Sequence, residues 1–136
     1  MAELQASLFG ILPFLSYFLA AIVMLLIFMA VYKIITPYNE MKLIKNNNRA
    51  ASLSFTGAVI GFSIPIASAA ANSVSLIDFF VWGLVAGLVQ IITFLVFRAF
   101  YPKVASRIEQ DENAIGIHLG GVSISVGLLN AACMTY

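Results

Sequence analysis

The 136-residue sequence has few charged residues, one cysteine and one histidine. Charged residues make up 10% of it and hydrophobic residues 62%, whereas ordinary soluble domains have about 25% and about 45–50%. Because Cys133 is the single cysteine, an intrachain disulfide is excluded, and one Cys with one His cannot supply the four ligands of a structural zinc site. The composition therefore predicts a protein of the lipid bilayer, and neither a metal nor a cofactor is expected.

Basic residues are also scarce, which argues against nucleic-acid binding. The seven Lys and Arg residues all lie in or beside two segments, residues 33–49 and 98–107, and none lies near either chain end or in the 72–77 turn. By the positive-inside rule, both segments are expected to be cytoplasmic and both termini to face outward.

Four apolar segments are long enough to cross a bilayer as helices. They are expected at about Leu12 to Tyr32, Ala50 to Ala71, Asp78 to Phe100 and Ala114 to Met134. The length of the first segment, and Glu3 in place of a positive n-region, argue against a cleaved signal peptide. We therefore expect an all-α membrane protein with four transmembrane helices in a single membrane domain, residues 1–136.

Polar residues at the helix starts predict where three of these helices begin. Asn48 and Asn113 are expected to cap the second and fourth helices. Ser75 and Asp78 form an S-x-x-D pattern before the third, which is the sequence form of a capping box.

The two long connections are expected to be solvated. Residues 103–112 read as a loop of mixed charge. Residues 36–49 read as a basic loop anchored by Tyr38, although Met41 and Ile44 leave a short interfacial turn as the alternative. The basic residues of this loop are Lys42, Lys45 and Arg49.

Small residues recur every three or four positions on the second and fourth helices, so that they share one face. On the second helix they are Ala50, Ser54, Gly57, Gly61, Pro65, Ser68 and Asn72, and on the fourth Gly116, Gly120, Ser123, Gly127 and Asn130. Such stripes let helices pack closely, as the spacings Gly57/Gly61, Gly83/Gly87 and Gly116/Gly120 also suggest, or they line a water-filled path. Pro65 is expected to kink its helix and to leave the Gly61 carbonyl without a donor. The choice between a dry seam and a path stays open, with a slight preference for the path.

Three further polar residues in the membrane helices are candidates for such a path. His118 could bind a cation or relay a proton, or be a neutral residue bonded to a neighbouring helix. Gln90 is either a hydrogen-bonding bridge between helices or part of a path, and so are Asn72 and Asn130. Asp78 is a helix cap or part of an outer vestibule. Cys133 is interpreted as a small packing residue, since it lies roughly 22 Å along the helix from His118.

The sequence also repeats itself. KIITP, which ends at Pro37, closes the first helix as RAFYP, which ends at Pro102, closes the third, and SAAAN resembles NAAC near the ends of the second and fourth. Each half is then one helical hairpin, residues 9–72 and 73–136. Because each half crosses the membrane twice, the two copies are expected to be parallel repeats.

NNNRAASLSFTGAVIG, IPIASAAANSVSLIDFFVWG and the ending NAACMTY resemble the YjfL-like family of bacterial inner-membrane proteins, a domain-of-unknown-function family (DUF 350). The resemblance covers nearly the whole chain. It implies four membrane helices from a duplicated helix pair, location in the bacterial inner membrane and no established activity. Relatives are often encoded beside a membrane-remodelling protein and a channel-like protein, which links the family to envelope stress by association alone.

Two functions follow as expectations. The first is an oligomeric pore or transport component for a small ion or solute. The alternative is a non-conducting scaffold that recruits a cytosolic membrane-remodelling partner through its basic loops. An enzyme is not expected, because no acid, base and nucleophile can converge.

Overall fold

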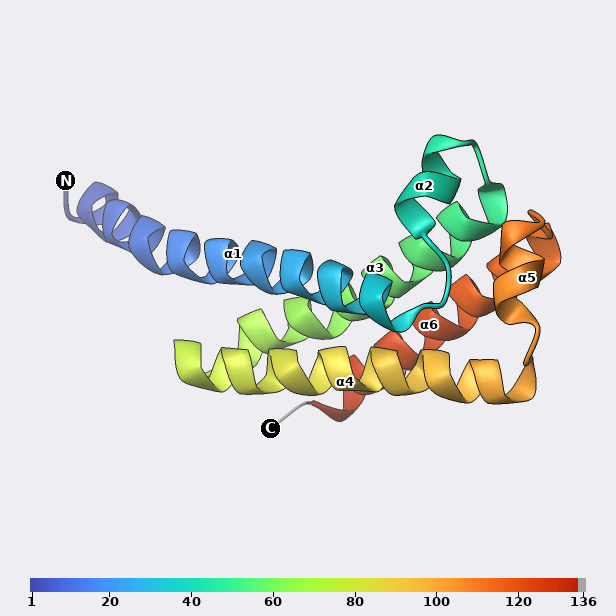
Figure 1. Cartoon of the computed structure of the whole chain (residues 1–136). Helices are drawn as coiled ribbons and strands as arrows, with labels where there is room; N and C mark the ends of the chain where they lie inside the picture. Colours follow the sequence, from blue (N-terminus) through green and yellow to red (C-terminus); the bar gives the residue numbers. More distant parts are fainter. Residues whose placement is uncertain (135–136) are drawn as a thin grey trace.

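The computed structural model describes residues 1–134, which form six helices (Figure 1). Four are long and apolar enough to cross a membrane: α1 (Ala2–Ile35), α3 (Arg49–Asn72), α4 (Leu76–Phe100) and α6 (Asn113–Cys133). Two short helices, α2 (Glu40–Lys45) and α5 (Val104–Glu109), lie in the connections. The predicted all-α membrane fold is therefore confirmed. The last two residues of the NAACMTY motif, Thr135 and Tyr136, lie outside the described residues.

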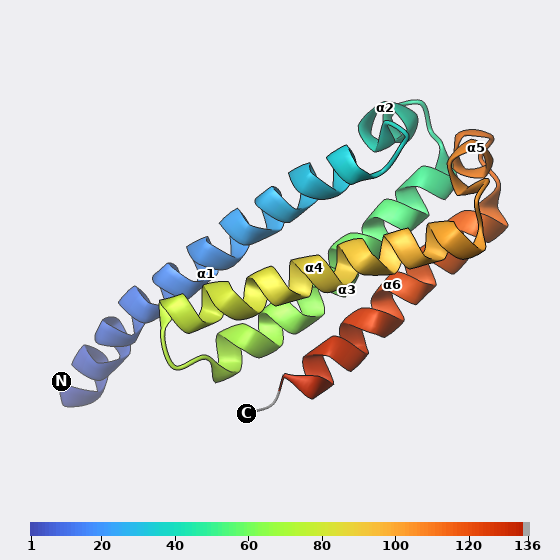
Figure 2. The ribbon, with the colours of Figure 1, turned by 60° about the horizontal axis from the view of Figure 1, so that its bottom comes forward.

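The short helices and the starts of α3 and α6 gather at one end of the bundle, here called the loop end (Figure 2). The start of α1 and the end of α6 lie toward the opposite end, here called the terminal end. α3 and α6 therefore run in the same direction. That the loop end faces the cytoplasm stays a prediction, based on the basic residues gathered there.

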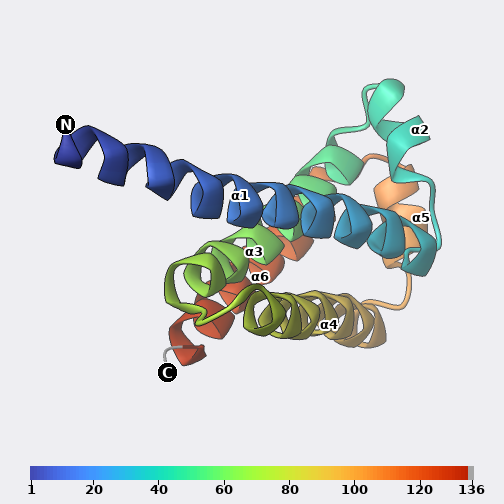
Figure 3. The ribbon, with the colours of Figure 1, turned by 90° about the vertical axis from the view of Figure 1, so that its left-hand side faces the viewer.

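α1 is longer than predicted, because it begins at Ala2 instead of Leu12. Its 34 residues span about 51 Å at 1.5 Å per residue, which exceeds the hydrocarbon thickness of about 30 Å. The apolar run from Leu12 marks only the part of α1 that is apolar enough to face lipid. It misses the start of the helix, because polar residues before the run, such as Glu3, also favour helix. The N-terminal part of α1 extends beyond the other helices (Figures 1 and 3). Side chains in this part, such as Phe9, are exposed.

The two connections are more ordered than predicted. Residues 36–49 contain the short helix α2, whose Met41 and Ile44 are partly buried against the core, so the expectation of a solvated loop is wrong for these two residues. The position of this helix at the membrane interface stays a prediction. Residues 103–112 contain α5, which buries Val104 and Ile108 completely. The apolar residues of each connection are few, but they are spaced to face the bundle.

Two of the predicted helix caps are confirmed. The Asn48 side chain accepts a hydrogen bond from the backbone N–H of Ala51 at 2.8 Å. The Ser75 hydroxyl accepts from the backbone N–H of Asp78 at 3.1 Å, and the Asp78 carboxylate accepts from the backbone N–H of Val74 at 3.1 Å.

The third cap prediction is wrong by one residue. α6 begins at Asn113, and the capping position belongs to Glu112, whose side chain makes no capping hydrogen bond. Its carboxylate instead accepts from Arg107 Nε at 3.1 Å. The error arises because local preference favours Asn over Glu as a capping residue. The ion pair of Glu112 depends on Arg107 of α5, which local preference does not take into account.

Aromatic rings fill the core between α1, α3 and α4. Phe28 of α1 stacks on Phe62 of α3, with ring centroids 4.4 Å apart. Nearer the loop end, the Tyr32 ring lies between Phe55 of α3 at 6.2 Å and Phe94 of α4 at 5.7 Å. These contacts attach the loop-end half of α1 to the bundle.

The helices of the two halves correspond in order: long, short, long. Asn47, just before α3, and Asp111, just before α6, both have positive φ angles, of 65° and 58°. The parallel repeat stays a prediction, which this matched geometry supports.

Candidate functional site

The small-residue stripes of α3 and α6 face each other within one chain. A Cβ atom added to Gly57 would lie 2.3 Å from the Gly120 Cα, and one added to Gly116 would lie 2.6 Å from the Ala50 Cα. Separations this short require the two backbones to be in van der Waals contact. The stripes therefore form a closed seam, here called the α3/α6 seam.

Pro65 and Gln90 meet this seam near the middle of the bundle. α3 continues through Pro65 as one helix, although Pro65 deprives the Gly61 carbonyl of its helical donor. This carbonyl lies against Gly127 of α6: a Cβ added to Gly127 would be 2.2 Å from its oxygen. Gln90 of α4 is fully buried, and its Nε2 donates to the Ser123 carbonyl at 3.0 Å. Its Oε1 has no hydrogen-bond partner among the described residues. Gln90 thus joins α4 to α6.

The stripe hydroxyls are buried in the loop-end and middle parts of the seam. Ser54 and Ser123 are each 1% exposed, and the Ser54 hydroxyl donates to the Ala51 carbonyl of its own helix. Within the described chain, no solute path separates α3 from α6 at these residues.

Toward the terminal end the stripe becomes more open. Ser68 is partly buried and its hydroxyl donates to the Ala131 carbonyl at 3.5 Å. Asn72 is exposed and its amide donates to the Ser68 carbonyl. The Nδ2 of Asn130 is buried without a partner among the described residues. Asp78 is partly buried in the first turn of α4, where Ser75 is the cap, and its carboxylate accepts from the backbone N–H of Val74.

The third glycine pair, Gly83 and Gly87 on α4, receives side chains instead of a backbone. A Cβ on Gly83 would lie 1.5 Å from the Met24 Cε, so the end of the methionine of α1 occupies this space. A Cβ on Gly87 would make only an ordinary contact, 3.7 Å from the Phe62 ring.

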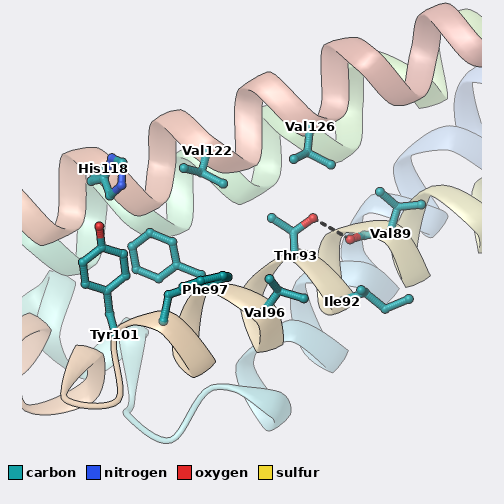
Figure 4. Close-up of a pocket in the computed structure, with 10 residues that line it drawn as sticks. Val89, Ile92, Thr93, Val96, Phe97, Tyr101, His118, Val122 and Val126 are labelled. Carbon is teal, nitrogen blue, oxygen red and sulfur yellow. Dashed lines mark hydrogen bonds between the residues drawn. The ribbon is translucent and has the colours of Figure 1, made fainter.

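His118 lies on the outside of the bundle rather than in the seam. It is exposed, and its ring lies 5.5 Å from that of Phe97 and 5.6 Å from that of Tyr101. These residues form one end of an apolar groove of about 530 Å³ between α4 and α6, with Val89 and Val126 at the other end (Figure 4). Besides the Tyr101 hydroxyl, the lining of this groove includes the hydroxyl of Thr93, which donates to the Val89 carbonyl at 2.7 Å. The groove thus offers a surface suited to lipid chains. Cys133 is also exposed, so it is not a packing residue within the chain.

Hydrogen bonds join the two halves at the loop end. Asn48, before α3, donates from Nδ2 to the Ile108 carbonyl of α5 at 2.8 Å. Asp111, before α6, accepts from the backbone N–H of Ala50 at 2.9 Å. The residues before α3 are therefore tied to α5, and the residue Asp111 before α6 is tied to the start of α3.

The structure also places a buried polar cluster at the loop end, which we call the Glu40 cluster: Tyr32, Thr36, Tyr38 and Glu40. The Thr36 hydroxyl donates to the Glu40 carboxylate. Glu40 is 1% exposed, Tyr32 1%, Thr36 5% and Tyr38 6%. This cluster was not predicted from the sequence, because acids in the connections were expected to be solvated. No local pattern marks it, since the chain is not helical between the end of α1 and the start of α2.

Burial perturbs the acids of this cluster that lie outside the membrane helices. Burial raises the pKa of Glu40, while the Thr36 hydrogen bond and the charge of Lys33 lower it in part. Burial and the neighbouring Glu40 raise the pKa of Tyr38 well above its ordinary value, and the adjacent Ser54 hydroxyl acts in the opposite direction. Both effects disfavour negative charge inside the cluster.

The predicted basic residues are on the surface. Lys42 and Lys45 are exposed on α2, and Arg49 is exposed at the start of α3; together they are called the basic surface. The opposite side of α2 packs on the core through Leu43 and Ile44. Because Glu40, the acid of α2, is buried, its charge is not presented beside these basic groups.

A family model described as "Domain of Unknown Function (DUF350)" matches residues 6–134. The chain is similar to the "UPF0719 inner membrane protein YjfL" of Escherichia coli strain K12, with 43% identity over 127 residues that cover 93% of this chain and 96% of the relative. It is also similar to the "UPF0719 transmembrane protein YshE" of Bacillus subtilis strain 168, with 24% identity over 119 residues, 86% of this chain and 89% of the relative. No solved structure matches the chain.

Proposed function

The chain belongs to the DUF350 family and is a multi-pass protein of the inner membrane, and from that premise we propose that it acts as a non-conducting scaffold. In this proposal the bundle holds the basic surface at the cytoplasmic face, where it binds anionic lipid headgroups and an acidic or membrane-remodelling protein. A non-enzymatic role is part of the proposal.

The observation that carries this proposal is the pairing of a rigid bundle with a fixed basic surface. The α3/α6 seam is closed by backbone contact at Gly57 and Gly120, which gives the chain a stable shape without a solute path between these helices. On that shape α2 is held through Ile44, so Lys42 and Lys45 have a defined position.

The experiment replaces Lys42, Lys45 and Arg49 by Gln together. Near an anionic surface each basic residue contributes about 1 kcal/mol, so the triple variant should weaken recruitment by up to about 3 kcal/mol. The measurement is sedimentation of the purified membrane-remodelling partner with proteoliposomes at low and high salt. A double variant, Arg98→Gln with Lys103→Gln, removes exposed charge from the other half as a control. Equal recruitment by the triple variant and the wild type would refute the scaffold proposal.

An oligomeric pore or transport component is the second candidate, and the Glu40 cluster favours it, because a buried carboxyl near a surface cavity is suited to handling a small ion. Since the α3/α6 seam is closed, such a path would have to lie between copies of the chain. Ion flux into liposomes, measured over a range of pH and voltage, distinguishes the two: the scaffold proposal expects none above empty liposomes.

A further inference from the structure

Three oxygen atoms of the Glu40 cluster are buried without hydrogen-bond partners among the described residues. They are the Tyr32 and Tyr38 hydroxyls and the Glu40 Oε2; the Ser54 hydroxyl lies beside that of Tyr38 but donates to the Ala51 carbonyl of its own helix. Both hydroxyls and the carboxyl are close enough to one another to interact electrostatically. Unpartnered polar atoms inside a protein are costly, so three in one cluster favour a ligand at this place.

We propose that the Glu40 cluster binds one monovalent metal cation, of the size of sodium or potassium, between the Glu40 carboxylate and the hydroxyl oxygens of Tyr32, Thr36 and Tyr38. This site lies apart from the basic surface, and it goes beyond the scaffold proposal.

The donor atoms select the class of ligand. They are all oxygens, which suit hard cations, and they carry a single formal negative charge. Within residues 1–134, no group of three His, Cys, Asp or Glu residues is placed to hold a metal ion. A divalent cation would therefore lack the carboxylates that normally balance its charge, whereas a monovalent cation balances Glu40 alone.

The charge of Glu40 also calls for a partner. The ion pair found in the described residues joins Arg107 to Glu112, and Lys33, which acts on Glu40 through space, has an exposed side chain. A proton on Oε2 would neutralise Glu40 but would itself be a buried donor in need of an acceptor, whereas a cation in the proposed site would use the lone pairs of the carboxylate and of the phenol oxygens.

The surroundings provide an entrance and walls. A surface cavity of about 480 Å³ is lined by Thr36, Tyr38 and Glu40, and also by Lys33. On the bundle side, the Phe94 ring lies 5.7 Å from the Tyr32 ring and 6.5 Å from the Tyr38 ring. A cation would thus enter from the loop end and be stopped by the aromatic core.

The test uses the full chain purified in detergent at pH 8 and fixed ionic strength. The melting temperature, followed by Trp82 fluorescence, is measured as N-methylglucamine chloride is replaced by sodium or potassium chloride. The expected result is a saturable rise in melting temperature, with one ²²Na⁺ or ⁸⁶Rb⁺ bound per chain in equilibrium dialysis. The Glu40→Gln variant should lose both responses, and Glu109→Gln, an exposed acid at the same end, should keep them.

Two further variants keep the test decisive if Glu40→Gln does not fold. Thr36→Val and Tyr38→Phe retain the carboxylate and each remove one oxygen, so they should shift saturation to higher cation concentration. The proposal is overturned if the wild type melts at the same temperature in all three salts at pH 8, because a bound proton or water would make the melting temperature independent of the cation. Every variant in this test retains the basic surface of Lys42, Lys45 and Arg49. A failure of the cation-binding test therefore says nothing against the scaffold proposal, which the recruitment experiment tests separately.

Discussion

Substitution of Gly57 by Ala should separate α3 from α6 and destabilise the bundle. The added Cβ would lie 2.3 Å from the Gly120 Cα and 2.5 Å from the Gly120 carbonyl oxygen, whereas ordinary contacts begin at 3.4 Å. Because the obstructing atoms are backbone, no side chain can rotate away, and the helices must move apart by about 1 Å. A gap of this size forfeits roughly a quarter to a half of the dispersion energy of each affected contact.

The expected cost is about 1–3 kcal/mol of unfolding free energy, the usual range for overpacking. The assay is equilibrium unfolding in mixed micelles, followed by circular dichroism. Gly121→Ala is the control on α6, the partner helix, since nothing lies within 4 Å of its added Cβ, and it should stay within about 0.5 kcal/mol of the wild type. If Gly57→Ala is as stable as Gly121→Ala, the α3/α6 seam is not closed and the reasoning fails.

Three other changes test the remaining contacts. Asn48→Ala should cost about 0.5–2 kcal/mol in the same unfolding assay, because α3 loses its cap and its hydrogen bond to the Ile108 carbonyl of α5; a change near zero would contradict the role of this contact. Gln90→Leu removes the hydrogen bond to Ser123 and should cost about 0.6–1.7 kcal/mol, whereas a stabilised variant would show that the unpartnered Oε1 dominates. In cation-free buffer, Glu40 should make stability fall as pH rises. The pKa of Glu40 is higher in the folded chain than in the unfolded chain, so the folded state binds a proton more tightly. The stabilisation from this proton is complete at pH values below the unfolded-state pKa, and it is lost as the pH rises through the folded-state pKa. Melting temperatures at pH 5 to 8 check this, and Glu40→Gln should have a flatter profile. The titratable or charged neighbours of Glu40 are Tyr32, Lys33 and Tyr38.

The membrane helices were predictable because their signals are local. Apolar length identifies each span, and the S-x-x-D pattern at Ser75 marks a helix start wherever the helix later packs. The start of α1 was missed for the same reason: apolar length reports contact with lipid and not the extent of the helix.

The partner of each stripe was not predictable from the residues alone. A small residue such as Gly57 indicates that a neighbour comes close, but the neighbour could belong to this chain, to another copy or to water. The structure supplies Gly120 as that neighbour. Similarly, Glu40 is buried only because α2 packs against the bundle, and a charge in a connection carries no mark of that packing.

Accessibility of the α3/α6 seam to water tests the central claim most directly. In a Cys133→Ser background, which removes the native thiol, Ser123→Cys places a thiol at a position that is 1% exposed, and Asn72→Cys places one at an exposed position near the terminal end. Each is treated in membranes with a charged, water-soluble thiol reagent. A closed, non-conducting bundle predicts labelling at position 72 and none at position 123. Labelling of position 123 at a comparable rate would show a wet path through the seam and contradict the account.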